Sequence, residues 1–380
     1  MIVRARTDIN ERLICKILKE GKGDTTPQPP STYFFNSGKS SIQFLLRIIG
    51  GGKTVGIQVY TCQSVLDAIL AEDDKPLFLD INPDYYTTTL DIVEKIVDKV
   101  DILILTHLFG IPNPDYIAIK NLCETKGIVL IDDLCQTFHA KVLGRNLEDM
   151  SDNYVYSFFY DKPISSLSGG MLKISNVFKD KADVIYSTLP KMSEGVAKKK
   201  LKSLLLMHKL LSPEIYTKEF RDGDAWKWIL FLWPISWSIL LLNYLVKGIW
   251  MRFLNKIVHF RYEENYISAM SELEIGYLLK MMFSFSDNNQ TLYKFCVSNN
   301  IEIPGYLKNE RISCSIAKRA IVKANLHSNH VQIGLYNWPT LICPKDEVIK
   351  FPRALSVINS HVNIPCWTDI ICTEEMDKLG

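Results

Sequence analysis

Between residues 33 and 178, short apolar runs alternate with stretches in which apolar residues recur three and four positions apart. The runs predict buried strands, and the stretches predict amphipathic helices. The predicted strands are 33–38, 54–60, 76–81, 101–110, 128–134, 154–160 and 169–175, and the predicted helices between them are 40–50, 62–72, 90–100 and 115–127. This alternation predicts an α/β fold with a mostly parallel sheet of the seven-stranded type and helices on both faces.

After residue 178 the pattern changes. Residues 196–211 are basic and amphipathic, residues 228–246 contain no charged side chain in 19 positions, and residues 268–285 predict a long helix. These changes in the sequence pattern predict three regions of the chain. We expect a large α/β domain at 1–178, a basic and apolar helical insert at 179–262, and a small C-terminal α/β domain with a connecting helix at 263–380.

Composition narrows the function only slightly. The chain has 380 residues, 47% of them hydrophobic, which is enough for a large core, and its net charge of +2 gives no reason to expect nucleic acid. Nine cysteines form no CxxC pair and no metal-ligand spacing with histidine, so we expect reduced thiols and no metal site. The first 20 residues lack the apolar core of a secretory signal, which predicts a cytoplasmic protein.

Two segments of the first domain are typical of anion and ligand sites. Residues 36–41, "NSGKSS", form a strand-to-helix turn, where backbone N–H groups and the helix dipole suit a phosphate, although such a turn alone is a weak signal. Asp132 and Asp133 end a buried strand, where ligands bind in open α/β sheets. The structural alternative for these carboxylates is a helix N-cap.

Lys162 and the pair Gly169-Gly170 add a third and a fourth signal. Lys162 follows the largely apolar run "YSFFYD", and an amine in an apolar pocket becomes a usable nucleophile because desolvation lowers its pKa. The alternative is a surface lysine after a strand. Two consecutive glycines allow a tight turn or a close approach of two backbone segments.

The order and spacing of these motifs resemble those of the DegT–StrS type of sugar aminotransferases, which use pyridoxal 5'-phosphate (PLP) and have the aspartate-aminotransferase-like fold. The family's Ser-Gly-Thr, Asp-x-x-Gln, Ser-Phe-x-x-x-Lys and Gly-Gly motifs match Ser37-Gly38, Asp133 with Gln136, Ser157-Phe158 with Lys162, and Gly169-Gly170. Further segments similar to the family lie at 76–91, 106–112, 269–279 and 362–370. The resemblance covers residues 33–178 well, 265–380 loosely and 179–262 not at all.

The resemblance implies a role for each matching residue. Lys162 would form the internal aldimine with PLP and then shuttle a proton to the substrate carbon, and Asp133 would pair with the pyridine nitrogen. Gln136 would hydrogen-bond near the 3-oxygen of the cofactor. The implied phosphate ligands are Gly38, Lys39 and Ser157, and Ser37 of the same turn is an implied cofactor-binding residue. The implied neighbours of the cofactor ring are Tyr60 and Cys62.

Some positions depart from the family pattern. Lys39 stands where the family has threonine, and Ser168 precedes Gly-Gly where the family has glutamate. Ile267 and Ala269 align with an asparagine and an arginine that serve the neighbouring subunit, so the contribution of a second subunit stays open. The lysine at position 162 argues against the dehydratases of the family, which carry histidine there.

The function implied by the resemblance is transamination of a nucleotide-linked keto-sugar to an amino-sugar for glycan biosynthesis, with glutamate or glutamine as donor, in a homodimer. Two alternatives stay open. The substrate could instead be lipid-linked, or the chain could be a degenerate, membrane-associated scaffold without catalysis. His107, His139 and Asp132 are more often structural than catalytic in such positions.

The apolar run at 228–246 raises the question of a membrane. As a helix, 19 residues span about 28 Å, near the thickness of the hydrocarbon layer. A single crossing would separate residues 265–380 from the first domain, so we expect peripheral contact through 226–256 at the inner face of the cytoplasmic membrane. Four tryptophans and flanking basic residues, Lys200 among them, would meet lipid headgroups. The alternative is an oligomer contact or a core helix.

Overall fold

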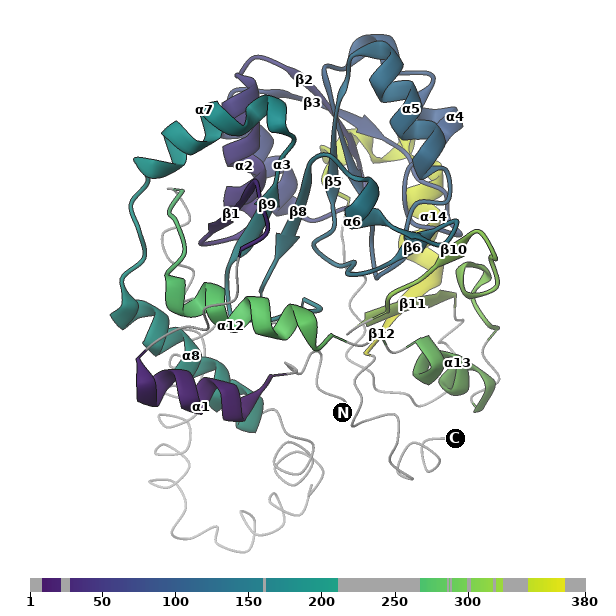
Figure 1. Ribbon diagram of the computed structural model, residues 1–380. Helices are drawn as coiled ribbons and strands as arrows, with labels where there is room; N and C mark the ends of the chain where they lie inside the picture. The colour runs from purple at the N-terminus through teal and green to yellow at the C-terminus, as the bar shows by residue number, and fades with distance from the viewer. Residues whose placement is uncertain are drawn as a thin grey trace, which may run out of the picture.

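The computed structural model (Figure 1) describes residues 9–21, 28–159, 162–210, 267–285, 287, 289–298, 302–316, 319–323 and 341–365. A seven-stranded sheet with the order β1-β9-β8-β5-β4-β2-β3 forms its centre. The strands are β1 (Thr32–Phe35), β2 (Thr54–Gln58), β3 (Lys75–Leu79), β4 (Ile102–Thr106), β5 (Val129–Asp133), β8 (Tyr154–Ser157) and β9 (Gly170–Lys173). Each predicted strand of the first domain is present, which confirms the predicted sheet.

The sheet is mostly parallel. β2 pairs in parallel with β3 and β4, β4 pairs in parallel with β5, and β5 pairs in parallel with β8. β9 runs antiparallel to both of its neighbours, β8 and β1. All strands of this sheet except β9 therefore point the same way, and their carboxyl ends meet at one edge, where α/β folds place their ligands.

Side chains alternate between the two faces of each strand and supply two apolar layers. On β4, Ile102 and Ile104 face one layer, and Leu103 and Leu105 face the other. The first layer is covered by α2 (Gly38–Ile49), α3 (Gln63–Leu70) and α7 (Asn176–Ser187), and the second is covered in part by α5 (Tyr116–Lys126). The helices predicted at 40–50, 62–72 and 115–127 are confirmed, and Gly127 ends α5 in a left-handed conformation with φ of 68°.

Three helices pack together at one end of the sheet: α1 (Glu11–Glu20), α8 (Glu194–Leu210) and α12 (Glu272–Phe283) (Figure 1). α8 buries Ala197, Leu201 and Leu204 in the same core layer as α12. Lys200 is buried as well and pairs with Glu274 of α12. The expectation that Lys200 contacts lipid headgroups is therefore wrong, because its ammonium lies inside the protein.

The described part of the C-terminal region contains short strands and helices, as its sequence pattern predicted. β10 (Ile312–Ser313) extends the hairpin of β6 (Lys141–Val142) and β7 (Arg145–Asn146), and β11 (Arg319–Lys323) pairs with β12 (His361–Pro365). The helices are α13 (Asn289–Ser298), α14 (Pro352–Ser360) and the 3₁₀ turns η2 (Gly305–Leu307) and η3 (Lys345–Lys350).

The structure differs from the sequence prediction in three places. The helix predicted over 90–100 is only α4 (Leu90–Val93) and the 3₁₀ turn η1 (Val97–Lys99). Five of its eleven residues are β-branched, which lowers helix propensity and explains why the helix does not continue. The hairpin with the short helix α6 (Leu147–Met150) and the helix α7 were not predicted.

Residues 211–266 lie outside the described ranges, so membrane contact through 226–256 stays a prediction. Among the described helices, none has both the length and the apolar character that a membrane crossing requires. The predicted boundary between residues 178 and 179 falls inside α7, which packs Ala182 against the sheet.

Candidate active site

The carboxyl ends of β5 and β8 carry two polar side chains on the same face of the sheet. Ile131 of β5 and Val155 of β8 belong to the core layer beneath α2 and α3. Because side chains two positions apart share a face, Asp133 and Ser157 also point toward that layer. Both residues lie at the ends of their strands, beyond the packed apolar layer. Their polar side chains therefore line a cavity instead of the core.

The N-terminus of α2 lies over the same point. Ser37 is the N-cap, and its Oγ accepts a hydrogen bond from the Ser40 backbone N–H at 3.1 Å. A Cβ on Gly38 would lie 2.8 Å from Ser157 Cβ, so only glycine allows α2 to approach β8 this closely. The close approach brings the first-turn N–H groups of a helix beside the Ser157 hydroxyl, an arrangement that suits a phosphate.

Gly169 and Gly170 serve the same close packing. Gly169 has φ of 141°, a conformation that disfavours other residues, and a Cβ on Gly170 would lie 2.3 Å from the Ser37 carbonyl oxygen. β9 can therefore pass directly against the turn that begins α2. The prediction that this pair permits close backbone approach is confirmed.

Lys162 lies in the loop between β8 and β9 and is 8% exposed. Its backbone N–H donates to the Phe159 carbonyl at 3.0 Å, and its carbonyl accepts from Ser165 Oγ at 3.0 Å. These bonds fix the backbone of Lys162 on both sides. The surface lysine that was the structural alternative is therefore excluded.

One cavity of about 200 Å³ brings most of these groups together. It is lined by Ser37, Gly38, Lys39, Ile42, Cys62, Ser64, Val65, Asp133, Cys135, Ser157, Phe159, Lys162, Ser168 and Gly169. An amine, a carboxylate and a helix N-terminus thus line one cavity. Residues from five separate segments supply them, so the site exists only in the folded chain.

Asp133 presents one carboxylate oxygen to this cavity. The side chain is 4% exposed, and Oδ1 accepts a hydrogen bond from the Cys135 N–H at 3.0 Å. The Cys135 thiol also forms a side-chain hydrogen bond with the Asp133 carboxylate. Limited access to water raises the pKa of the Cys135 thiol well above its usual range, and the Asp133 charge adds to this rise while the Lys162 charge opposes it. Cys135 therefore stays a neutral thiol and is no nucleophile.

Two residues implied by the resemblance lie elsewhere. Tyr60 is 1% exposed in the core layer on the other face of the sheet, and Gln136 uses its Oε1 to accept from the Phe109 N–H at 3.0 Å. Neither lines the cavity. Cys62, at the N-cap of α3, does line it, so of the two ring neighbours considered from the sequence only this one faces the space.

Ser64, Ile42, Val65 and Phe159 line the cavity but were not singled out from the sequence. Ser64 sits in the first turn of α3, directly after a strand, which is the same strand-to-helix arrangement as in α2. This second strand-to-helix turn was the sequence feature from which Ser64 could have been predicted as a site residue. The apolar members lie on helix faces and after a strand, where the sequence pattern indicates only burial. Within the described ranges, no cluster of His, Cys, Asp and Glu side chains is suited to a metal.

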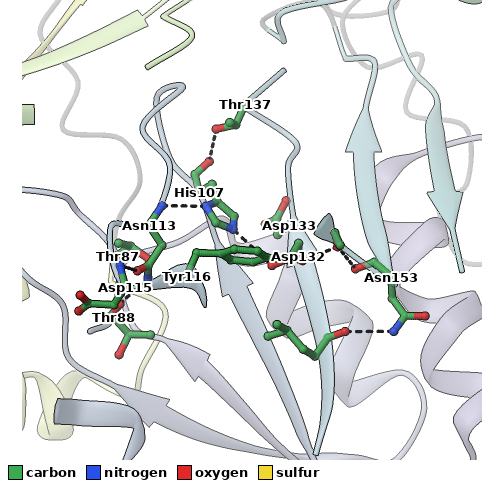
Figure 2. A network of polar contacts seen from close by, with 12 residues as sticks. Thr87, Thr88, His107, Asn113, Asp115, Tyr116, Asp132, Asp133, Thr137 and Asn153 are labelled. Carbon is green, nitrogen blue, oxygen red and sulfur yellow. Dashed lines mark hydrogen bonds and ion pairs between the residues drawn. The ribbon is translucent and has the colours of Figure 1, made fainter. Parts of the chain in front are cut away.

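Asp132 points away from the cavity into a buried polar network on the opposite face of the sheet, shown in Figure 2. Its Oδ2 accepts from Tyr116 Oη at 2.9 Å and from Ser151 Oγ, and its Oδ1 lies 3.4 Å from His107 Nε2. Burial, together with the Asp132 charge, raises the pKa of Tyr116 far above its usual range. The two neighbouring aspartates therefore have separate surroundings.

His107 is held in one tautomer by this network. Its Nδ1 accepts from the Asn113 backbone N–H at 3.1 Å, so the ring proton lies on Nε2 and points to Asp132 (Figure 2). The backbone N–H of His107 donates to the Asp133 carbonyl at 3.1 Å, and Thr137 Oγ1 donates to the His107 carbonyl at 2.8 Å. The network thus ties β4 to the end of β5, and the expected structural role of His107 and Asp132 agrees with these contacts.

Comparison with known proteins shows a family match over part of the chain. Residues 33–188 match the model of the DegT/DnrJ/EryC1/StrS aminotransferase family, which confirms the resemblance inferred from the motifs. A UDP-N-acetyl-3-dehydro-α-D-glucosamine 3-aminotransferase of Acidithiobacillus ferrooxidans is 29% identical over 140 residues, or 36% of this chain and 38% of that protein. GDP-perosamine synthase of Escherichia coli O157:H7 is 29% identical over 125 residues, or 33% of this chain and 34% of that protein. These alignments span little more than a third of either relative.

Solved structures share the fold over nearly the whole chain. The PLP form of a Streptococcus pneumoniae protein described as a sugar aminotransferase has a TM-score of 0.63 at 15% identity and covers 99% of this chain and 96% of its own. DesV of S. venezuelae has a TM-score of 0.60 at 15% identity and covers 95% of this chain and 93% of its own. The similarity in fold therefore extends beyond residues 33–188.

Proposed function

We propose, on the premise that residues 33–188 are a DegT/DnrJ/EryC1/StrS-type aminotransferase segment, that the protein is a PLP-dependent transaminase. Its substrate would be a nucleotide-linked keto-sugar, and its product an amino-sugar for glycan biosynthesis, with glutamate or glutamine as amino donor. The observation that carries the proposal is the single cavity that unites Lys162, Asp133, Ser157 and the N-terminus of α2.

The residues of the cavity fit PLP in chemistry and shape. Ser37, Gly38, Lys39 and Ser157 would hold its phosphate, since the helix N-terminus, two hydroxyls and a cation face one point and glycine keeps that point open. Asp133 offers its carboxylate Oδ2 to a pyridine nitrogen. Cys62 is a cavity neighbour of both Asp133 and Lys162, whereas Tyr60 and Gln136 would contribute only from behind the lining.

The proposed division of labour follows from these contacts. PLP, when bound, supplies an electron sink that lowers the energy of negative charge on the substrate carbon. Lys162 would hold the cofactor through Nζ and then move the proton at the substrate carbon with the same amine. Asp133 would keep a positive charge on the ring nitrogen opposite, because a buried carboxylate favours the protonated form of its partner.

The substrate class rests on the relatives. Three curated proteins similar to residues of this chain are named for sugars linked to UDP, dTDP and GDP. These relatives are all named for nucleotide-linked sugars, but the nucleotide differs among them. They therefore support a nucleotide-linked sugar as the substrate and do not identify which nucleotide or sugar it is. The same comparison favours a nucleotide-linked sugar over the lipid-linked alternative.

A substrate panel tests the proposal. We expect the purified chain, incubated with PLP, glutamate and a set of UDP-, dTDP- and GDP-linked keto-sugars, to yield one product whose mass matches replacement of a carbonyl oxygen by an amine. The control omits the amino donor, and a parallel reaction with glutamine in place of glutamate shows which donor is used. A chain that binds no PLP under these conditions would instead support the scaffold without catalysis.

We also propose a cytoplasmic homodimer with peripheral membrane contact through residues 226–256. The resemblance supports the dimer, and the composition of 226–256, with five tryptophans at 226, 228, 233, 237 and 250 and flanking basic residues, supports the contact. The division into 1–178, 179–262 and 263–380 remains part of the same proposal. Sedimentation equilibrium of the purified chain measures the dimer directly.

Deletion of residues 226–250 should move the protein from the membrane fraction to the supernatant. The deletion removes the tryptophan-rich apolar run together with Lys227 and Lys247, and insertion of that run at the interface would supply most of the attachment, so the loss should be nearly complete. Ultracentrifugation of lysates with vesicles of anionic lipid measures the distribution. If the full chain and the truncated chain both stay in the supernatant, the contact does not exist.

A further inference from the structure

Two opposite charges are buried where α8 packs on α12. Lys200 Nζ lies 2.6 Å from Glu274 Oε1, and the two side chains are 4% and 0% exposed. Burial raises the pKa of the Glu274 carboxyl, and the Lys200 charge opposes that rise. The surrounding residues of both helices are apolar, Leu201 and Leu204 on α8 and Leu273 and Leu278 on α12.

The pair is difficult to explain by stability alone. Removing two charges from water costs several kcal/mol per ion in general, and well-packed apolar residues in the same volume are often at least as stable. An apolar contact between α8 and α12 would therefore serve the packing equally well. We therefore expect the Lys200 ammonium to have a second role, in which its charge contacts another polar group of the protein.

That contact is the backbone beside the cavity. Lys200 Nζ donates to the Ser168 carbonyl oxygen at 3.4 Å, and the same oxygen accepts from Ser166 Oγ at 2.7 Å. Ser168 and Gly169 both line the cavity. A buried ammonium thus reaches the wall of the proposed cofactor site from outside.

A chain of hydrogen bonds continues from this point to Lys162. The Phe158 N–H donates to the Gly169 carbonyl at 2.9 Å, and the Ser166 N–H donates to the Phe158 carbonyl at 2.9 Å. Ser165 Oγ then donates to the Lys162 carbonyl at 3.0 Å. Residues 162–169 are therefore bonded to one another and to Phe158 and Phe159 just after β8, and Lys200 adds a contact from α8 at Ser168.

We propose that the Lys200–Glu274 pair positions the loop 162–169, with Lys200 anchoring the Ser168 carbonyl and Glu274 orienting Lys200. Both are positioning residues, because neither lines the cavity. The proposal rests on the proposed function in one respect, namely that Lys162 is the reacting amine. Its structural content, the order of the loop, does not depend on PLP.

A double-mutant cycle separates positioning from packing. The variants are Lys200→Met, Glu274→Met and the double variant, each compared with wild type. The matched control is Lys191→Met with Glu272→Met, which removes an exposed pair of 2.7 Å between α12 and the segment before α8. Melting temperature, hydrogen exchange of residues 162–169 without cofactor and the Kd for PLP are measured.

Each single variant should melt at a lower temperature, because it leaves one buried charge unpaired, and the double variant should recover much of that loss. The double variant should nevertheless exchange faster than wild type in 162–169, with α5 unchanged as internal reference. It should also bind PLP about tenfold more weakly, the effect of one hydrogen bond from a charged donor. The control variants should match wild type in all three measurements.

Wild-type exchange in 162–169 together with wild-type PLP affinity in the double variant would reduce the pair to packing and overturn the proposal. If the double variant does not fold, Lys200→Arg replaces it, since it keeps the charge but shifts the donors; unchanged exchange in the loop then counts against positioning. If wild type binds no PLP, the proposed function fails, and the exchange measurement alone still decides the role of the pair.

Discussion

The Lys162→Ala variant should lose the visible absorption of bound PLP and at least about 10³-fold of its transaminase turnover. The expected loss is large because the same atom, Lys162 Nζ, would both hold the cofactor and move the substrate proton. Lys162 as a residue is 8% exposed and lines a cavity together with Asp133, so no solvent group substitutes for its amine easily. Spectra of the purified variant and single-turnover rates with glutamate measure the two losses separately.

Lys39 provides the matched control, because it is the other amine that lines the cavity. Lys39→Ala should keep the absorption band and weaken PLP binding, since its place at the first turn of α2 suits the phosphate. Borohydride reduction followed by peptide mapping shows which lysine carries the cofactor. A reduced adduct on Lys39, or a band that survives in Lys162→Ala, would contradict the assignment of Lys162.

Replacement of the two neighbouring aspartates should produce opposite results. Asp133→Asn should reduce turnover by about 10²-fold or more and leave the melting temperature nearly unchanged, because the charge that faces the cavity acts mainly on the cofactor. Asp132→Asn should reduce the free energy of unfolding by about 3 kcal/mol, since its carboxylate receives hydrogen bonds from Tyr116 and Ser151 in the core. Its turnover, measured below the melting temperature, should stay within about tenfold of wild type.

Thermal melts and kinetics on the same preparations test this contrast. Tyr116→Phe adds a control for the network, because it removes one donor to Asp132 and should cause a smaller loss of stability with normal turnover. Should Asp132→Asn lose turnover as strongly as Asp133→Asn while remaining folded, the network would be part of the catalytic apparatus. The assignment of a structural role to Asp132 and a cofactor-binding role to Asp133 would then be wrong.

The sheet and its ligand edge were predictable because their signals are local. Apolar runs of strand length and helical spacing within residues 33–178 predicted the strands β1 to β5, β8 and β9, and the motif spacing placed Asp133, Ser157 and Lys162 near its end. A lysine after an apolar strand cannot by itself distinguish a pocket from the surface. The structure distinguishes the two, because Lys162 is buried and lines the cavity, and hydrogen bonds within residues 159–165 hold its backbone.

The sequence alone determined the architecture and indicated the candidate reacting groups, because strand alternation, turn glycines and motif order act over a few neighbouring residues. Only the tertiary structure showed the buried partners of Asp132, placed Tyr60 and Gln136 outside the cavity lining and showed that Lys200 is buried against Glu274. The partners in those contacts lie far apart along the chain. Which of them meet depends on how helices pack across the sheet, and no local pattern of residues contains that information.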